Sequence, residues 1–204
     1  MADIATLGAA MDLQISQLEH ISNNLANAST PGFKAVHLLM LKDLEEVAVT
    51  EEEPEIPSEL VVDFSQGIPQ KTSNILDVTI QGDGFFVIQT DQGLAYTKNG
   101  TFTVNSSNQI VAQDGSLVMG TSGPITLIDG QINIAQDGSI SVDGNEIGKL
   151  KIVDFTNRQA LVKASGSLYY DEGQAGLKAV EKPNIQSGFL ELSNVNVVRE
   201  MADM

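Results

Sequence analysis

The stretch QISQLEHISNNLANASTPGFKA, residues 14–35, ends an apolar helical pattern with amide side chains and a proline–glycine turn. Asn23, Asn24 and Asn27 each lower helix propensity relative to alanine, by roughly 0.5 kcal/mol apiece. The Thr-Pro-Gly turn that follows predicts the end of the helix, because the residue before proline avoids the α region. The stretch therefore predicts a helix with three amides at its helix-to-loop transition.

The first 30 residues carry a seven-residue apolar repeat. One row consists of Ile4, Met11, Leu18 and Leu25, and a second row, three residues on, consists of Leu7, Gln14, Ile21 and Ala28. This a/d pattern predicts a helix that packs along another helix. The alternative is a single amphipathic helix lying on a globular core. We favour the helix–helix seam because the stripe is narrow and polar residues such as Ser16, Glu19 and Ser22 lie off it.

Composition excludes several classes of function. The net charge is −16, so the surface repels phosphate, and neither nucleic acid nor anionic lipid is an expected partner. The absence of cysteine removes disulfides, thiolate metal sites and thiol catalysis. Residues 1–20 show neither the basic region nor the apolar run of a Sec signal peptide, and no window has the length and apolarity of a membrane span.

The chain divides into four segments on these patterns. We expect an N-terminal coiled-coil helix and turn at 1–34, an acidic linker at 35–63, a β domain at 64–190 and the start of a C-terminal helix at 191–204. Residues 43–63 contain nine acidic side chains and no basic one, which is typical of a solvated linker. The alternative is an acidic docking or metal-accumulating segment.

Residues 64–182 show the pattern of short β-strands. Runs such as FFVIQT and LKIVDF alternate with Asp-Gly and Asn-Gly dipeptides, which close hairpins and tight turns. We expect Phe85, Phe86, Phe102 and Phe155 to supply much of the core. The predicted fold class is therefore mainly β with terminal α-helices: a hairpin-rich, all-β domain between N- and C-terminal coiled-coil helices.

The last residues return to a helical pattern. Ser193-Asn194 is a candidate N-cap, and Val197, Met201 and Met204 follow at helical spacing. A helix this short is marginal alone, so we expect the natural chain to continue the seam.

Candidate chemical sites fail on spacing. His20 and His37 lie in no recognisable catalytic motif, and residues 82–86, GDGFF, lack the lysine and glycine spacing of a phosphate loop. The aspartates of residues 129–144 lack the spacing of an EF-hand loop. We therefore predict that the protein is not an enzyme and has no catalytic residue, cofactor site, metal site or small-molecule substrate. Two unfinished helical seams predict instead a protein that assembles, and surfaces that do not close on themselves build helical filaments.

Three ordered stretches resemble the bacterial flagellar axial proteins, the rod and hook components. Residues 14–35 resemble the N-terminal signature of that family. Residues 64–120 resemble its central region, with the G-D-G-F-F and Y-T-K-N-G-T-F motifs. Residues 188–204, GFLELSNVNVVREMADM, resemble the start of its C-terminal helix. Together they cover nearly all of the chain except the acidic segment and the middle of the β domain.

The resemblance implies a structural subunit whose terminal helices pack as a coiled coil lining a hollow tube, with the β domain outside. It implies export through the flagellar apparatus, a place in the basal-body rod, and partners that are other copies and neighbouring rod or hook subunits. The short stretch between Phe33 and Phe64 favours a proximal-rod type, with distal-rod or hook types next. The rival hypothesis is a secreted β-rich binding module oligomerised by its helices.

In this interpretation the assembly interface consists of the apolar seam residues and the amides. They are Ile4, Leu7, Met11, Leu18, Ile21, Asn23, Asn24, Leu25, Asn27, Val197, Met201 and Met204. We expect the three amides either to bond across subunits or to satisfy chain ends. Local capping of the helix and turn is the alternative.

Overall fold

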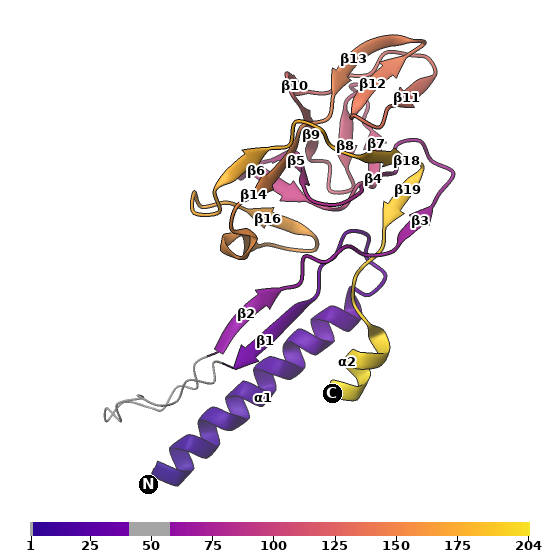
Figure 1. The fold of residues 1–204 in the computed structure, drawn as a ribbon. Coiled ribbons are helices and arrows are strands. Elements are labelled where there is room, and N and C mark those ends of the chain that lie inside the picture. Colours follow the sequence, from indigo (N-terminus) through magenta and orange to yellow (C-terminus); the bar gives the residue numbers. More distant parts are fainter. Residues whose placement is uncertain (1, 41–57) are drawn as a thin grey trace.

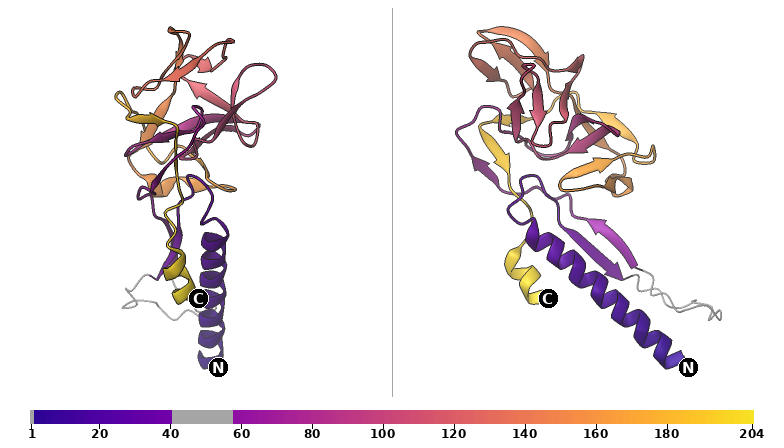
Figure 2. Two further views of the ribbon diagram at one scale, coloured as in Figure 1. Left: turned by 90° about the vertical axis from the view of Figure 1, so that its right-hand side faces the viewer. Right: turned by 180° about the vertical axis from the view of Figure 1, so that it is seen from behind.

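The computed structural model describes residues 2–40 and 58–204, which form a stalk and a β domain at one end of it (Figure 1). The stalk contains helix α1 (Ala2–Ala26), the hairpin of β1 (Val36–Met40) and β2 (Ser58–Val62), and helix α2 (Val197–Asp203). The hairpin runs along α1, and α2 lies on another side of α1, as the views in Figure 2 agree. Within the described ranges, no helix has both the length and the apolarity to cross a membrane.

The β domain is built from short antiparallel strands. Their bounds are β3 Pro69–Lys71, β4 Val78–Ile80, β5 Phe85–Thr90, β6 Gly93–Thr97, β7 Phe102–Val104, β8 Ile110–Ala112, β9 Leu117–Gly120, β10 Gly123–Pro124, β11 Ile132–Ile134, β12 Ser139–Val142, β13 Asn145–Lys149, β14 Ile152–Phe155, β15 Val162–Lys163, β16 Leu168–Tyr170, β17 Leu177–Ala179, β18 Ile185–Ser187 and β19 Phe189–Glu191. A short 3-10 helix, η2 (Arg158–Ala160), follows β14.

The largest sheet has the strand order β15-β16-β6-β5-β9-β8-β7, with β14 also paired to β5. A three-stranded sheet, β11-β12-β13, and the pairs β4–β18 and β3–β19 complete the domain. The β12–β13 turn is closed by Asp143 and Gly144, with φ values of 50° and 83°, as the Asp-Gly signal predicts. Because β18 and β19 pair with β4 and β3, the end of the chain returns to the beginning of the domain.

Strand β5 supplies both hydrophobic cores of the domain. Successive side chains of a strand point to opposite faces. Phe86 and Ile88 therefore enter one core, whereas Phe85 and Val87 enter the second. All four side chains are buried, because β5 has a packed core on each face. The sequence-based expectation that Phe85, Phe86, Phe102 and Phe155 are core residues is confirmed.

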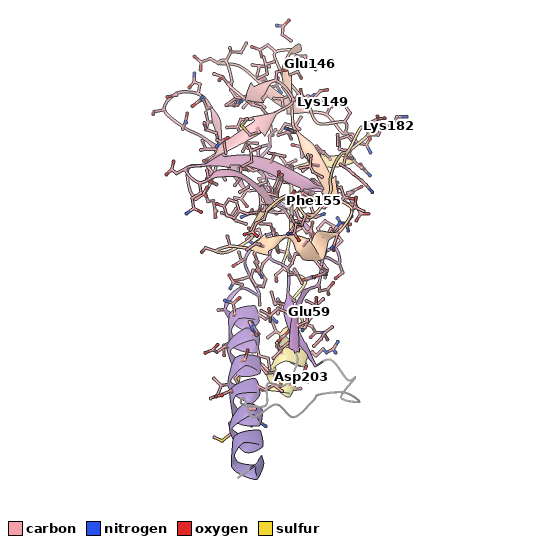
Figure 3. All side chains as sticks on the ribbon, turned by 90° about the vertical axis from the view of Figure 1, so that its left-hand side faces the viewer. Glu59, Glu146, Lys149, Phe155, Lys182 and Asp203 are labelled. Carbon is pink, nitrogen blue, oxygen red and sulfur yellow. The ribbon has the colours of Figure 1, made fainter. Side chains whose placement is uncertain are left out.

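The second core extends to the stalk. It contains Val36 of β1 and Val62 of β2 together with Phe85 and Phe155. Phe155 packs edge-to-face against Phe85, with ring centroids 5.6 Å apart. In Figure 3, Phe155 lies inside the β domain, and Glu59 marks β2 beside α1. The base of the hairpin is thus part of the core of the β domain.

Two expectations on segment boundaries differ from the structure. Residues 35–63 were expected to form a linker, but β1 and β2 lie at its two ends and pair in register. Most of the acidic run lies outside the described residues. Its composition concealed β2, because the Leu-Val-Val of that strand becomes informative only when β1 is there to pair with it.

Helix α2 also begins later than its expected cap. Asn196 is the N-cap of α2, and its side chain accepts a hydrogen bond from the Arg199 N–H. Ser193 and Asn194 were expected in that role, but the Asn194 side chain bonds instead to the Ala35 N–H and to the Asp63 carbonyl. The fold class is otherwise confirmed as mainly β with helices near the two ends of the described chain, while the coiled-coil character stays a prediction.

Replacing Phe86 with alanine tests the first core. The side chain is 1% exposed, so Phe86→Ala should lower the free energy of unfolding by about 3–5 kcal/mol through lost burial and a residual cavity. Leu94→Ala, on the exposed face of β6, is the control and should stay within about 0.5 kcal/mol of the wild type. Equal effects of the two substitutions in urea denaturation would contradict the placement of this core.

Candidate functional site: the junction of stalk and β domain

The residues expected at an assembly interface divide into exposed and buried groups. The side chains of Met11 and Leu18 are 55% and 43% exposed. Ile21 and Asn24 are buried instead, and Leu25 is half-buried. Ile4 and Leu7 lie on α1, but their side chains are outside the described part. The apolar row of α1 is therefore covered near the β domain and uncovered further along the stalk.

The expected α2 positions are largely exposed. Val197, Met201 and Met204 have exposed fractions of 37%, 64% and 63%. Helix α2 nevertheless contacts α1 through Glu200, which is 4% exposed and accepts a hydrogen bond from the Asn24 amide at 3.1 Å. The two helices are therefore joined by a buried polar contact, and the apolar side chains expected on the α2 side of the interface are exposed.

The Asn24 side chain joins three elements. Its Nδ2 donates to the Val36 carbonyl at 2.9 Å, and its Oδ1 accepts from the Val36 N–H at 3.0 Å. With the bond to Glu200, one buried amide therefore connects α1, β1 and α2. A buried amide costs stability unless its donors and acceptor are paired, and here they are. Asn24 thus satisfies segments of its own chain.

The other two amides of the signature act locally or face solvent. Asn27 Nδ2 donates to the Asn23 carbonyl at 2.9 Å, and Asn27 Oδ1 accepts from the Thr30 hydroxyl at 3.2 Å. Asn27 therefore caps the end of α1 and the turn, which is the local alternative. Asn23 is exposed on α1. Whether its amide bonds across subunits stays a prediction.

A buried ion pair lies where the three signature stretches meet. Lys34 Nζ donates to Glu191 Oε1 and, at 2.6 Å, to the Ser65 carbonyl. The Gly67 N–H donates to the same Glu191 oxygen at 2.9 Å. The side chains of Lys34 and Glu191 are 0% and 1% exposed. Removing one partner of such a pair leaves an uncompensated buried charge, which typically costs about 3–5 kcal/mol.

Backbone approach around this ion pair explains two glycines. Gly32 has a φ of 68°, and a Cβ there would lie 2.3 Å from the backbone nitrogen of Asn99. A Cβ at Gly67 would lie 1.9 Å from the Leu192 carbonyl oxygen. Larger residues would therefore separate the segments that the ion pair joins.

Asn194 completes the connection between the chain ends. Its Oδ1 accepts from the Ala35 N–H at 2.8 Å, and its Nδ2 donates to the Asp63 carbonyl at 2.7 Å. The Gly32 N–H donates to the Glu191 carbonyl at 2.8 Å. We call this set the junction: residues 32–35, 63–67 and 191–194.

Two further lysines surround the junction. Lys98 donates to the Gly82 carbonyl at 2.8 Å, and burial lowers the pKa of its ammonium to about 8, although nearby Glu191 acts in the opposite direction. Lys163 donates to the Lys34 carbonyl at 2.9 Å and lies 3.7 Å from the centroid of the Phe33 ring. Burial also lowers the pKa of Lys163 to about 8. These two cations connect main-chain segments around the junction.

Sequence reasoning missed the partners of the junction. Lys34 and Glu191 are 157 residues apart, and neither has a local pattern that points to the other. Gln159 was also missed: its Nε2 donates to the Val62 carbonyl at 2.8 Å, and its Oε1 accepts from the Val62 N–H at 3.1 Å. One signal was available in the sequence. Lys34, Gly67 and Glu191 each lie in one of the three stretches that resemble the flagellar axial proteins, and such stretches are expected to share a structural role.

Fold and junction together define a class of protein: a β domain carried on a stalk whose helices expose several apolar side chains. Three family models match the chain. They are the flagella basal body rod protein model at residues 4–34, the flagellar hook protein FlgE/F/G D1 domain model at 79–145, and the flagellar basal body rod FlgEFG protein C-terminal model at 186–204.

Similar curated proteins carry the same description. The FlgG basal-body rod protein of Buchnera aphidicola subsp. Acyrthosiphon pisum is 32% identical, covering 95% of this chain and 85% of the relative. FlgF of Caulobacter vibrioides is 31% identical over 92% of this chain and 80% of the relative, and FlgG of Bacillus subtilis is 31% identical over 93% and 83%. The chain therefore belongs to the flagellar basal-body rod protein family of the FlgF/FlgG kind, whose members are structural subunits of the basal body.

A double-mutant cycle tests the ion pair. Lys34→Met should lower the free energy of unfolding by about 3–5 kcal/mol, because Glu191 is left charged and buried. The double variant Lys34→Met/Glu191→Leu should regain most of that loss, because no unpaired charge remains. Urea denaturation provides the measurement. Losses in the two single variants that simply add in the double variant would show that the pair is not coupled.

The lowered pKa of Lys98 predicts a pH dependence. Its pKa is about 8 in the folded state and 10.5 when unperturbed, so between these values the unfolded chain binds more protons. Stability from this group should therefore rise from pH 8 towards 10.5. Burial raises the pKa of Tyr96 and of Tyr169, which opposes the rise above pH 10.

The comparison with Lys98→Met isolates this contribution. Between pH 8 and 10, the free energy of unfolding of the wild type should rise more steeply than that of the variant, in which Lys163 still titrates. Parallel curves from denaturant titrations at several pH values would rule out the assignment to Lys98.

Proposed function

We propose that the chain is a rod subunit that polymerises through its stalk into the hollow axial tube of the flagellar basal body. The observation that carries this proposal is an exposed apolar surface on the stalk. It consists of Met11, Ile15 and Leu18 on α1 and Val198, Met201 and Met204 on α2, with exposed fractions between 43% and 79%. We call this set the stalk stripe. Exposed apolar side chains gathered on the two helices in this way are typical of interaction sites.

The arrangement of the stalk favours neighbouring copies as the occupant. The inward face of α1 is already used, because Ile21 is buried and Asn24 bonds to β1 and α2. On α1, the stripe thus lies where the described part of the chain leaves the helix uncovered. Packing of this stripe on the stalks of neighbouring rod or hook subunits as a coiled coil would repeat at every contact, and non-closing contacts build a helical tube.

The position of Ile15 refines the expected seam. It was not in the a or d rows of the sequence pattern, yet it lies between Met11 and Leu18 at helical spacing and is 53% exposed. In this proposal the docking face of α1 is therefore rotated from the a/d seam towards Ile15, because the d position Ile21 is occupied within the chain.

We extend the proposal to activity and export. No enzymatic activity, cofactor, nucleic acid or small-molecule substrate belongs to this function, because the polar clusters of the junction serve to join segments. Export without a Sec signal peptide remains part of the proposal. The place of the subunit in the proximal rather than the distal rod is also a proposal. The FlgF and FlgG relatives match with nearly the same identity, so their identities favour neither place.

Leu18→Asp separates assembly from folding. Leu18 is 43% exposed, so the change should alter the stability of the monomer by no more than about 0.5 kcal/mol. In a tube, an unpaired charge in an apolar contact should cost several kcal/mol at every repeat. Cells carrying only this variant should export it, build no rod beyond its place of entry and be non-motile.

Glu19→Gln, an exposed neighbour on α1, is the matched control and should support swimming. Swimming assays, immunoblots of exported protein and electron microscopy of basal bodies provide the measurement. Complete basal bodies and normal swimming with Leu18→Asp would exclude the stalk stripe as the packing surface.

A further inference from the structure

The base of the β1–β2 hairpin is held on both outer edges by amide side chains. Val36 and Val62 lie directly opposite each other in the hairpin. Opposite residues in an antiparallel pair either bond to each other or direct their backbone groups outwards. Here they direct them outwards: Asn24 takes both backbone groups of Val36, and Gln159 takes both backbone groups of Val62. Each amide therefore acts as one residue of an additional strand.

The two amides come from different parts of the molecule. Asn24 belongs to α1 and is 1% exposed. Gln159 belongs to η2 of the β domain, where Asn157 caps η2 through the Gln159 N–H. Arg158 beside it forms two hydrogen bonds to Asp154, at 2.8 and 2.9 Å. Gln159 is thus presented to the hairpin by a short, well-braced element. The hairpin base consequently bridges α1 and the β domain.

Burial strengthens this bridge. The side chains of Val36 and Val62 are 9% and 8% exposed and belong to the second core, with Phe85 and Phe155. The hairpin base is therefore bound to the β domain by its side chains and by Gln159, and to α1 by Asn24. A strand pair connected in this way resists bending across its own plane.

The junction alone would leave a possible rotation. The Lys34–Glu191 pair and Asn194 join the segments around residues 32–35 to the β domain. A set of contacts gathered at one place acts as a pivot. The bonds at the next residues of the hairpin, Val36 and Val62, add Asn24 of α1 and Gln159 of η2 to this connection. With these two holds on opposite edges of the hairpin, rotation about the pivot is opposed.

We propose that the β1–β2 hairpin is a rigid strut that sets the angle between α1 and the β domain, with Asn24 and Gln159 as its two positioning residues. The strut is a property of a single subunit, and only its purpose rests on the proposed function. In a helical tube, each subunit has to place its stalk and its β domain at one fixed angle for all contacts to repeat. The strut supplies that angle and transmits torque between the inner and outer layers.

A distance measurement between spin labels tests the strut. The 204-residue sequence has no cysteine, so the exposed positions Glu19→Cys on α1 and Ser106→Cys in the β7–β8 turn can carry the two labels. The full chain is measured by double electron–electron resonance at a concentration where ultracentrifugation shows a monomer. The otherwise unaltered labelled protein should give one narrow distance peak.

Two substitutions remove the amide connections. Gln159→Leu and Asn24→Leu introduce an apolar side chain of similar size and lose the bonds to Val62 and Val36, so each should lose the narrow peak and give a broad distribution. The exposed amides Gln92→Leu and Asn23→Leu are matched controls, one in the β domain and one on α1, and should keep the narrow peak. The thermal transition of the β domain is recorded for every variant.

A narrow peak in either Gln159→Leu or Asn24→Leu, with an intact β-domain transition, would overturn the strut, as would a broad distribution in the labelled reference protein. If Gln159→Leu loses the thermal transition of the β domain, the distance distribution of Asn24→Leu, which alters only α1, decides whether the strut exists. The outcome is independent of polymerisation. Rod formation by Leu18→Asp would remove the proposed assembly surface and leave the strut standing, whereas a failed strut would leave the assembly surface untouched.

Discussion

The buried Lys34–Glu191 ion pair is the constraint on which the rest of the structure depends. Two charges with almost no exposed surface are tolerable only if each finds its partner, and Lys34 also needs the Ser65 carbonyl. Residues from the N-terminal turn, the start of the β domain and the segment after β18 must therefore be brought to one place. Glycines at 32 and 67 allow the backbones to approach closely enough.

Because the junction joins the two terminal segments at one end of α1, that end of the helix is partly buried, whereas the described side chains further along it are largely exposed. Near the junction, Ile21 and Asn24 are used within the subunit. Further from it, Met11, Ile15 and Leu18 have no cover from the described part of the chain. The family to which the chain belongs consists of structural rod subunits. The exposed apolar positions of α1 agree with the proposal that neighbouring subunits cover this part of the stalk.

The sequence predicted what short-range patterns determine. Alternating and short apolar runs predicted the strands, and the four phenylalanines were placed correctly because large aromatic side chains in such runs supply much of the buried apolar surface of a core. The amide-rich helix end was recognised as unusual, but its partners were not, since Asn24 bonds to Val36 and Glu200 only after the chain has folded. Gln159 has no sequence signal, because a single glutamine after a strand is ordinary. Strand β2 was hidden by its acidic surroundings, and the cap of α2 moved from Ser193-Asn194 to Asn196 because the junction uses Asn194.

The central claim is that the polar groups of the signature stretches join segments within one subunit and leave the far part of α1 for assembly. Residue-resolved hydrogen exchange on the dilute monomer tests it most directly. The account predicts slow exchange at the N–H groups of Gly32, Ala35, Val36 and Gly67, which donate to Glu191, Asn194 and Asn24 within the chain. It also predicts faster exchange in α1 before Leu18. Rapid exchange at those four amides in the monomer, with protection gained only on polymerisation, would contradict the account.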